Sequence, residues 1–573
     1  MLVVGGKVSL QQLVADWLEE YKEEKDLAMV RLVQFFFSAS GSSGQVTLEM
    51  METMEQGEMI NRMAEQFYRE TPGAAGTYPV AGQGAMARKF RGNLSEFVLQ
   101  LIKQAQNSIL YDQFLMDNLV SLLTQLSDSQ VRPFRHTATL SSMSLMTGLV
   151  HVWVTVSKMK LNISKQLKRE EKKISNQREV NKMEVLTTKL GEMEENQEEL
   201  QKMLTYMFKS VFVHRYRDVV EEIRCLCLLE LGVWLMECPM MFMEDSYLKY
   251  LGWSLNDKAG SVRLAAIKSL LPLYNSRDVK DKLVLFTEKF MERLVSLILD
   301  KEIDVSVCAI QLLQCLVKYQ PNNLTDQHCE MVYELVYSTH RMVARAAGSF
   351  LQQRLFKSSM VEQVRTRRGK MRKPNTLHIR DLIQFFIESE KPKYEAYLVD
   401  SLIDHPMLKD WECMTDLLVE EAGPDEEDLD DSQETALIVL MVASMKQVVT
   451  GELPVGRGPS TGRRVQSAKE NRQMALEKEV LSTHFMATLP SLIHKYLPDQ
   501  AKVSKLLVIP QFMNLEMFTT SRQERALDGL MKLLQEVVEK HTEEQVLGEA
   551  FKTLELFCSP QSSCYGRCNA RRE

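Results

Sequence analysis

The sequence predicts an all-α fold built from stacked pairs of helices, and three observations lead to this prediction. Apolar residues recur at helical spacing along almost the whole chain, whereas alternating β-branched runs bounded by turns are scarce. No proline occurs between Pro133 and Pro239. This absence suits long uninterrupted helices, because proline removes a backbone hydrogen bond and clashes with the preceding turn. A short sequence pattern also recurs at intervals of about 40 residues.

The recurring pattern is a valine followed four residues later by an alanine. It occurs at Val262 and Ala266, at Val305 and Ala309, and at Val343 and Ala347. The first two copies are preceded by an Asp-Lys pair at the same offset. Packed helices approach to about 8–10 Å only where the contact residues are small, which explains the alanine. The pattern favours a HEAT- or armadillo-like helical-repeat solenoid; chance similarity among helical hairpins of equal length is the alternative.

We expect five segments along the chain. They are an N-terminal helical region (1–150), long charged helices (151–211), helical repeats at 212–297, further repeats with basic and acidic loops (298–557), and a divergent, disordered tail (558–573). The long charged segment is basic in its first part and acidic in its second, and it has only a narrow apolar stripe. This pattern predicts a projecting charged helical hairpin that turns near Gly191.

Composition excludes several classes of protein. The 573 residues are 45% hydrophobic and 26% charged, with a net charge of −7, which is ordinary for a folded chain. We find no run of about 20 uncharged apolar residues and no basic leader, so we expect neither a membrane partner nor secretion. Ten cysteines are too sparse for a disulfide scaffold and indicate reduced thiols in a cytosolic or nuclear protein.

Catalytic and cofactor motifs are missing from the sequence. There is no CxxC or HExxH pattern for zinc, and residues 456–464 lack the order of a phosphate-binding loop. We therefore predict a binding protein with no enzymatic activity, no metal site and no cofactor. Two alternatives stay open: a generic HEAT adaptor such as a transport receptor, and a nuclease or NTPase hidden in the loops.

Three basic patches are candidates for contact with DNA phosphates. The first patch surrounds Phe90 and consists of Arg88, Lys89 and Arg91. The second patch lies on the charged hairpin and consists of Lys165, Lys168, Arg169, Lys172 and Lys173. The third is the basic loop at residues 365–373. A solvated helix face explains the first two patches equally well, and a nuclear-import signal explains the third.

One aromatic stretch has the composition of a peptide-binding hot spot. In residues 245–253, Lys249 and Trp253 are four positions apart and share a helix face, with Tyr250 one position round. The alternative is that these aromatic residues form part of the repeat core.

Several long motifs resemble one known family. FVHRYRD (212–218), DSYLKYLGW (245–253), KLVLFTEKF (282–290) and LDKEIDVSVCAI (299–310) are similar to the stromalin conservative domain, which we place at 212–297. Similarity continues through LSDSQVRPFRHTATL (126–140), HRMVARAAGSFL (340–351) and LPVGRG (453–458). Over roughly residues 7–557 the chain is identified as a member of the SA/STAG (stromal antigen) subunit family of cohesin.

The resemblance implies a nuclear, chromosome-bound, non-enzymatic HEAT-repeat protein. Such subunits bind the kleisin, and through it the SMC heterodimer, together with double-stranded DNA in chromatin. They act in sister-chromatid cohesion and chromosome segregation, and they dock regulators such as CTCF, shugoshin and Wapl. By motif, the docking residues would be Tyr216, Arg217, Asp245, Leu248, Lys249, Tyr250, Trp253, Leu285, Phe286 and Lys289.

The sequence departs from the family pattern in three respects. Lys289 stands where the family commonly has arginine, whose planar fork makes bidentate contacts that lysine cannot make. The family resemblance is lost from about Ser559, short of the family's usual length, which suggests a truncated or alternatively spliced product. Divergence from the somatic paralogues favours the meiotic, germline type.

Overall fold

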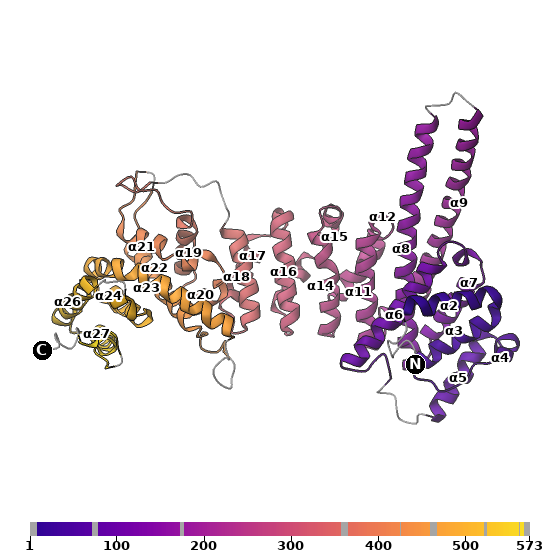
Figure 1. Ribbon diagram of the computed structural model, residues 1–573, viewed down its shortest axis with the longest axis horizontal. Coiled ribbons are helices and arrows are strands. Elements are labelled where there is room, and N and C mark those ends of the chain that lie inside the picture. Colours follow the sequence, from indigo (N-terminus) through magenta and orange to yellow (C-terminus); the bar gives the residue numbers. More distant parts are fainter. Residues whose placement is uncertain are drawn as a thin grey trace. The chain divides into compact units, whose positions relative to one another are not determined.

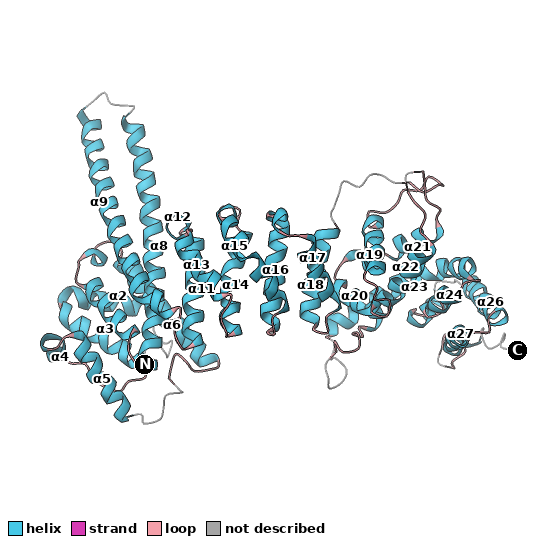
Figure 2. Cartoon of the chain, turned by 180° about the vertical axis from the view of Figure 1, so that it is seen from behind, coloured by secondary structure: helices cyan, strands magenta, loops and turns pink. Residues whose placement is uncertain are grey.

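The computed structural model describes residues 9–70, 78–171, 177–356, 365–424, 426–458, 467–520, 524–560 and 562–566. Within these ranges the regular elements are all helical, and one isolated β-bridge joins Arg365 and Met371 (Figure 2). The all-α prediction is therefore confirmed for the described part of the chain. The chain divides into two compact units, Met1–Ser296 and Leu297–Glu573.

The first unit contains helices α2 to α15 (Figure 1). Their bounds are α2 Leu10–Glu23, α3 Lys25–Ala39, α4 Leu48–Thr53, α5 Gln56–Glu70, α6 Ala85–Ala105, α7 Leu115–Ser127, α8 Arg132–Glu171, α9 Gln177–Met207, α10 Val213–Arg215, α11 Glu221–Glu237, α12 Pro239–Phe242, α13 Asp245–Ser254, α14 Gly260–Asn275 and α15 Val284–Ser296.

Helices α8 and α9 form the predicted hairpin, which projects from the rest of the first unit (Figure 1). Lys160 Nζ lies 3.2 Å from a carboxylate oxygen of Glu194, so an ion pair joins the two helices. The predicted turn near Gly191 is wrong, because Gly191 lies inside α9. Helix α8 also crosses the expected boundary at residues 150/151 without a break, since it begins at Arg132.

Helix α8 is the one described helix that is long and apolar enough to cross a membrane, although no such stretch was expected from the sequence. However, 83% of its apolar window is buried inside the protein. Its neighbours there are α6, α7 and α11, so this stretch is a core helix.

The second unit contains helices α16 to α27 (Figure 1). Their bounds are α16 Ile303–Tyr319, α17 Asp326–Glu334, α18 Arg341–Leu355, α19 Thr376–Glu388, α20 Glu395–Leu402, α21 Trp411–Val419, α22 Asp431–Thr450, α23 Ala468–Tyr496, α24 Gln500–Leu506, α25 Glu516–Thr520, α26 Glu524–Lys540 and α27 Glu544–Phe557. Helices α16, α18, α20 and α22 pack side by side in this order. In the expected disordered tail, Cys564 is 1% exposed and its thiol lies 3.5 Å from the carbonyl oxygen of Leu515.

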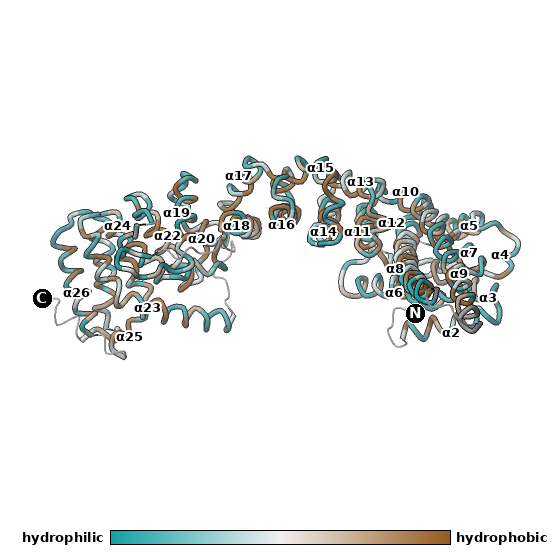
Figure 3. The backbone as a smooth tube through the Cα atoms, turned by 90° about the horizontal axis from the view of Figure 1, so that it is seen from above, coloured by the Kyte–Doolittle hydropathy of each residue, from teal (hydrophilic) through white to brown (hydrophobic). Residues whose placement is uncertain are grey.

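The repeat pattern corresponds to equivalent positions in three helices. Each valine is the third residue of α14, α16 or α18, and each alanine four residues later is 0% exposed. The aspartates of the two Asp-Lys pairs make the same turn, since Asp257 accepts from the amide of Ala259 and Asp300 from that of Glu302. Figure 3 shows hydrophobic and hydrophilic stretches alternating along the helices, as expected where one side of each helix is buried.

Candidate functional site

The predicted docking residues come from three neighbouring segments of the first unit. Tyr216 and Arg217 directly follow α10, five more residues lie on α13, and the remaining three lie on α15. Helices α13 and α15 pack together, and the ring of Tyr216 lies 4.8 Å from that of Tyr250 on α13. The structure thus brings these ten residues to one region.

Burial separates the ten residues into two groups. Leu248, Tyr250 and Phe286 are 1%, 7% and 4% exposed, so they support the surface from below. Trp253 is 49% exposed and Leu285 is 67% exposed. We call the outer group the α13–α15 ridge: Tyr216, Arg217, Asp245, Lys249, Trp253, Leu285 and Lys289.

A cluster of aromatic rings holds the ridge in place. A single π-helical turn, η2 (Phe208–Phe212), leads from α9 into α10. The ring centroids of Phe208 and Phe212 lie 5.6 Å and 5.3 Å from that of Tyr250, in edge-to-face geometry. Burial raises the pKa of Tyr250, which therefore stays neutral and packs as an apolar group. Phe208 and Phe212 are not among the site residues predicted from the sequence, although their spacing of four with Tyr216 was a usable signal.

The exposed part of the ridge combines aromatic, aliphatic and cationic groups. Lys249 Nζ lies 5.1 Å from the ring centroid of Tyr250 and 5.5 Å from that of Trp253, a cation–π arrangement. Arg217 and Lys289 are also exposed. Such a surface can bury an apolar side chain of a peptide while its cations hold carbonyl oxygens or carboxylates.

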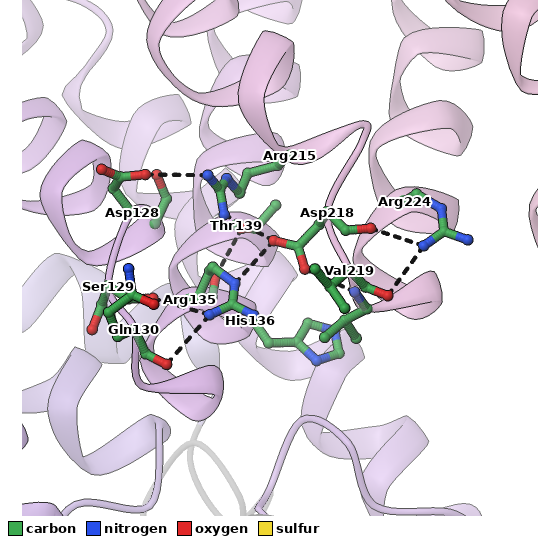
Figure 4. A network of polar contacts seen from close by, with 12 residues as sticks. Asp128, Ser129, Gln130, Arg135, His136, Thr139, Arg215, Asp218, Val219 and Arg224 are labelled. Carbon is green, nitrogen blue, oxygen red and sulfur yellow. Dashed lines mark hydrogen bonds and ion pairs between the residues drawn. The ribbon is translucent and has the colours of Figure 1, made fainter.

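The HRYRD motif also builds a buried ion-pair network (Figure 4). Asp218, whose side chain is 2% exposed, accepts from Nε of Arg135 at 2.9 Å and from Nη1 of Arg215 at 2.8 Å. Arg224 donates to the carbonyl oxygen of Asp218 and binds Asp257 through two hydrogen bonds of 2.8 Å. The network thereby fixes α8, α11 and the turn before α14 next to the ridge.

The basic patch on α6 is only partly free. Arg88 and Lys89 are exposed in the first turns of the helix. Arg91 instead donates hydrogen bonds to the carbonyl oxygens of Val80 and Gly82, at 2.8 Å and 3.0 Å, and so holds the preceding loop. Arg88 and Arg91 also line a cavity of about 550 Å³ whose wall includes Glu221 and Glu222. These carboxylates reduce the attraction of this patch for phosphates.

The basic patch on the hairpin is accessible. Lys165, Lys168 and Arg169 are exposed on α8, while Lys172 and Lys173 lie outside the described residues. Phe90 of α6 and Leu140 of α8 belong to one core cluster. Lys165 is 25 residues beyond Leu140, which corresponds to about 37 Å along the helix axis. The two patches therefore cannot contact the same phosphate, although a short duplex could span both.

No cluster of three or more metal-ligating side chains occurs among the described residues, and we assign no cofactor site. The cysteines at positions 225 and 227 lie on α11, and burial raises the pKa of both thiols. Cys227 is a neutral core group, whereas Cys225 is half-buried and lines the cavity beside Arg88.

Comparison with known families gives three matches along the chain. A STAG domain matches residues 76–189 and a stromalin conservative domain matches residues 217–291. The HEAT-repeats domain of cohesin subunit SCC3/SA matches residues 397–573. The third match includes residues 558–573, which we expected to diverge from the family.

Individual relatives agree with these matches. The chain is 45% identical over 570 residues to cohesin subunit SA-1 of Xenopus laevis and 42% identical over 574 residues to cohesin subunit SA-3 of Homo sapiens. These alignments cover 99% and 100% of this chain but 45% and 46% of the relatives, so the chain spans about half of their length.

A solved structure has the same fold. Cohesin subunit Scc3 from Z. rouxii, residues 88–1035, superposes with a TM-score of 0.76 at 17% identity, over 100% of this chain and 67% of that one. Together with the three domain matches, these relatives show that the chain belongs to the SA/Scc3 family of cohesin subunits.

Proposed function

We propose that this chain is a non-enzymatic scaffold of the cohesin complex that acts in sister-chromatid cohesion at chromosomes in the nucleus. Membership of the SA/Scc3 family over the full chain carries this proposal. As a scaffold it would bind the kleisin, and through it the SMC heterodimer. The meiotic type stays a prediction, since identities of 45% to SA-1 and 42% to SA-3 do not favour it.

The α13–α15 ridge is proposed as the docking surface for regulatory peptides of the CTCF, shugoshin or Wapl kind. Three features of the ridge support this role. Trp253 offers an exposed ring, Leu285 offers an exposed aliphatic side chain, and Lys249 lies beside the indole. A peptide with an aromatic anchor and acidic flanks matches this combination in apolar character and charge.

Double-stranded DNA is the proposed ligand of the basic patches. The exposed cations Lys165, Lys168 and Arg169 on the hairpin are favoured over the α6 patch, because glutamates lie beside the latter and Arg91 is engaged by the backbone. Substituting these three hairpin residues by glutamine should reduce the salt slope of DNA binding by about 0.9 for each phosphate that is no longer neutralised.

Titration calorimetry of the whole chain with a fragment of a kleisin tests the scaffold proposal. We expect saturable binding to the native fragment and none to a scrambled peptide of equal composition. The Trp253→Ala variant should keep kleisin binding if the regulators use a separate part of the surface. Absence of heat and of co-elution with the native fragment at micromolar concentrations would refute the kleisin scaffold.

A further inference from the structure

Two segments of opposite charge face each other in the second unit. Residues 365–380 contain seven Arg and Lys residues and no carboxylate, whereas residues 412–428 contain eight Asp and Glu residues and no cation. The described residues of these two segments contact each other through side chains and backbone. We call this pair of segments the clasp.

Its exposed contacts are ion pairs that solvent can reach. Arg367 pairs with Glu421 at 2.6 Å, and Lys370 pairs with Asp416 at 2.8 Å. Lys373 pairs with Glu412, and Arg368 lies 4.0 Å from Glu420. The side chains of Arg367 and Arg368 are 75% and 83% exposed. Exposed pairs of this kind contribute little to stability, so competing charges can displace them.

A buried anchor fixes the clasp independently of those pairs. Glu426, 7% exposed, binds Arg372 and Arg380 at 2.8 Å each. Arg372 also donates to the carbonyl oxygens of Asp416 and Glu420. The amide of Arg367 donates to the carbonyl oxygen of Glu421 at 3.2 Å. Neutralising the outer carboxylates would therefore leave both segments in place.

The outer pair of Lys373 and Glu412 is fully ionised near neutral pH. Burial lowers the pKa of Lys373, but its hydrogen bond to Glu412 and the nearby acidic groups outweigh this effect and raise the pKa overall. The same hydrogen bond lowers the pKa of Glu412. Both members of this pair therefore carry their charge over the physiological range.

We propose that the clasp is an autoinhibited DNA-binding site, in which carboxylates of residues 412–428 occupy cations of residues 365–373 as phosphates would. The combined charge of the two segments is −1, from seven cations and eight carboxylates. At physiological salt, charges act over about 8 Å, so an approaching polyanion meets no net attraction. Removal of a few outer carboxylates makes the same surface cationic without moving it.

Duplex DNA is the chosen occupant because it carries one negative charge per about 1.7 Å of axis, a density that can compete with clustered carboxylates. This choice rests on the proposed chromosomal function. A nuclear-import receptor is the other partner that binds basic segments, and the experiment below distinguishes it from duplex DNA.

The test uses the whole chain with Glu412→Gln, Glu420→Gln and Glu421→Gln combined. The probe is a fluorescent 30-base-pair duplex, followed by anisotropy across a salt series. We expect about tenfold tighter binding at low salt and a salt slope steeper by about 2–3, since each additional phosphate neutralised adds about 0.9. Adding Arg367→Gln, Arg368→Gln and Lys370→Gln should abolish this gain.

A matched control separates the clasp from total charge. Glu52→Gln, Glu55→Gln and Glu58→Gln change the net charge equally at exposed positions of the first unit. Equal DNA affinity and slope in the two triple variants would overturn the proposal, as would a gain in import-receptor binding without a gain in DNA binding. If the triple clasp variant is unstable, Glu421→Gln alone should still tighten DNA binding two- to threefold, because Glu421 is 65% exposed.

Two further measurements distinguish failure of the clasp from failure of the cohesin scaffold. Kleisin binding should be the same in every clasp variant. The gain in DNA affinity should also persist when Lys165, Lys168 and Arg169 on the hairpin are changed to glutamine. Normal kleisin binding without any gain in DNA affinity would reject the clasp alone.

Discussion

The ring of Phe290 on α15 packs directly on Gly252 of α13: a Cβ atom added to Gly252 would lie 2.2 Å from Cζ of Phe290. Real Cβ contacts are never so short, so the absence of a side chain at Gly252 sets the distance between the two helices that carry the ridge. Arg293 of α15 adds to this contact by donating to the carbonyl oxygen of Leu255, at the end of α13.

Replacing Gly252 with alanine should therefore destabilise the first unit and disturb the ridge. Overpacking of this kind costs about 1–3 kcal/mol. Gly92→Ala in α6 is the matched control, because a Cβ there meets nothing within 4 Å; alanine inside a helix should stabilise by about 0.5–1 kcal/mol. Denaturant unfolding monitored by circular dichroism should give opposite signs for the two variants. Equal changes in unfolding free energy for the two variants would contradict the close contact between Gly252 and Phe290.

Trp253→Ala should weaken docking of a peptide with an aromatic anchor and acidic flanks by about 2 kcal/mol, because an exposed aromatic anchor is removed. The melting temperature should hardly change, since the indole is 49% exposed. Tyr250→Ala provides the contrast: its ring is 7% exposed, so its removal should lower stability by about 3–5 kcal/mol. Calorimetric titration and thermal melts of both variants check this. A large fall in melting temperature for Trp253→Ala would mean that the indole is structural.

The periodic features of the fold were predictable because they depend on local sequence. The Val–Ala pattern identified α14, α16 and α18, since each helix needs the same small residue at the same position. The turn of the hairpin was not predictable from Gly191. Glycine in an exposed helix costs only about 1 kcal/mol, which the rest of α9 outweighs. The helices are instead separated by residues 172–176, which contain neither glycine nor proline.

The composition of the candidate site was predictable, but the burial of its members was not. Leu285 and Phe286 are adjacent in sequence, yet only the second is buried, because helix packing decides which side of α15 is covered. Long-range ion pairs were equally unpredictable from the sequence, because Arg367 and Glu421 are 54 residues apart and no local pattern connects them. Arg91 looked free beside Arg88, but the loop before α6 engages its guanidinium.

Asp218→Asn should destabilise the first unit strongly. The substitution keeps the shape but removes the charge that compensates Arg135 and Arg215, and breaking a buried pair in this way costs about 3–5 kcal/mol. Asp128→Asn is the control, since Asp128 pairs with the same Arg215 at 3.1 Å but is 81% exposed. Its substitution should cost at most about 1 kcal/mol. Urea unfolding curves of both variants give the comparison, and similar midpoints would argue against the network.

His136 should make the first unit sensitive to acid. Its side chain is 5% exposed, and its Nδ1 lies 2.8 Å from the hydroxyl oxygen of Tyr78. Burial lowers its pKa from 6.5 to about 4; Glu222 and Asp218 oppose this shift, while Arg132 and Arg91 add to it. Between these two values the unfolded chain binds a proton that the folded chain does not bind. Stability must therefore fall as the pH is lowered through this window, by about 2 kcal/mol between pH 7 and pH 5.

His136→Gln removes the titrating group and should flatten the dependence of unfolding free energy on pH over that range. Tyr78→Phe should instead lower stability by a similar amount at every pH and keep the slope, because it removes a hydrogen bond but leaves the imidazole buried. Urea unfolding at half-unit steps from pH 7 to pH 5 distinguishes the two variants. If the unfolding free energy of His136→Gln depends on pH as steeply as that of the unchanged chain, other groups cause the acid sensitivity, because this variant has no imidazole at position 136.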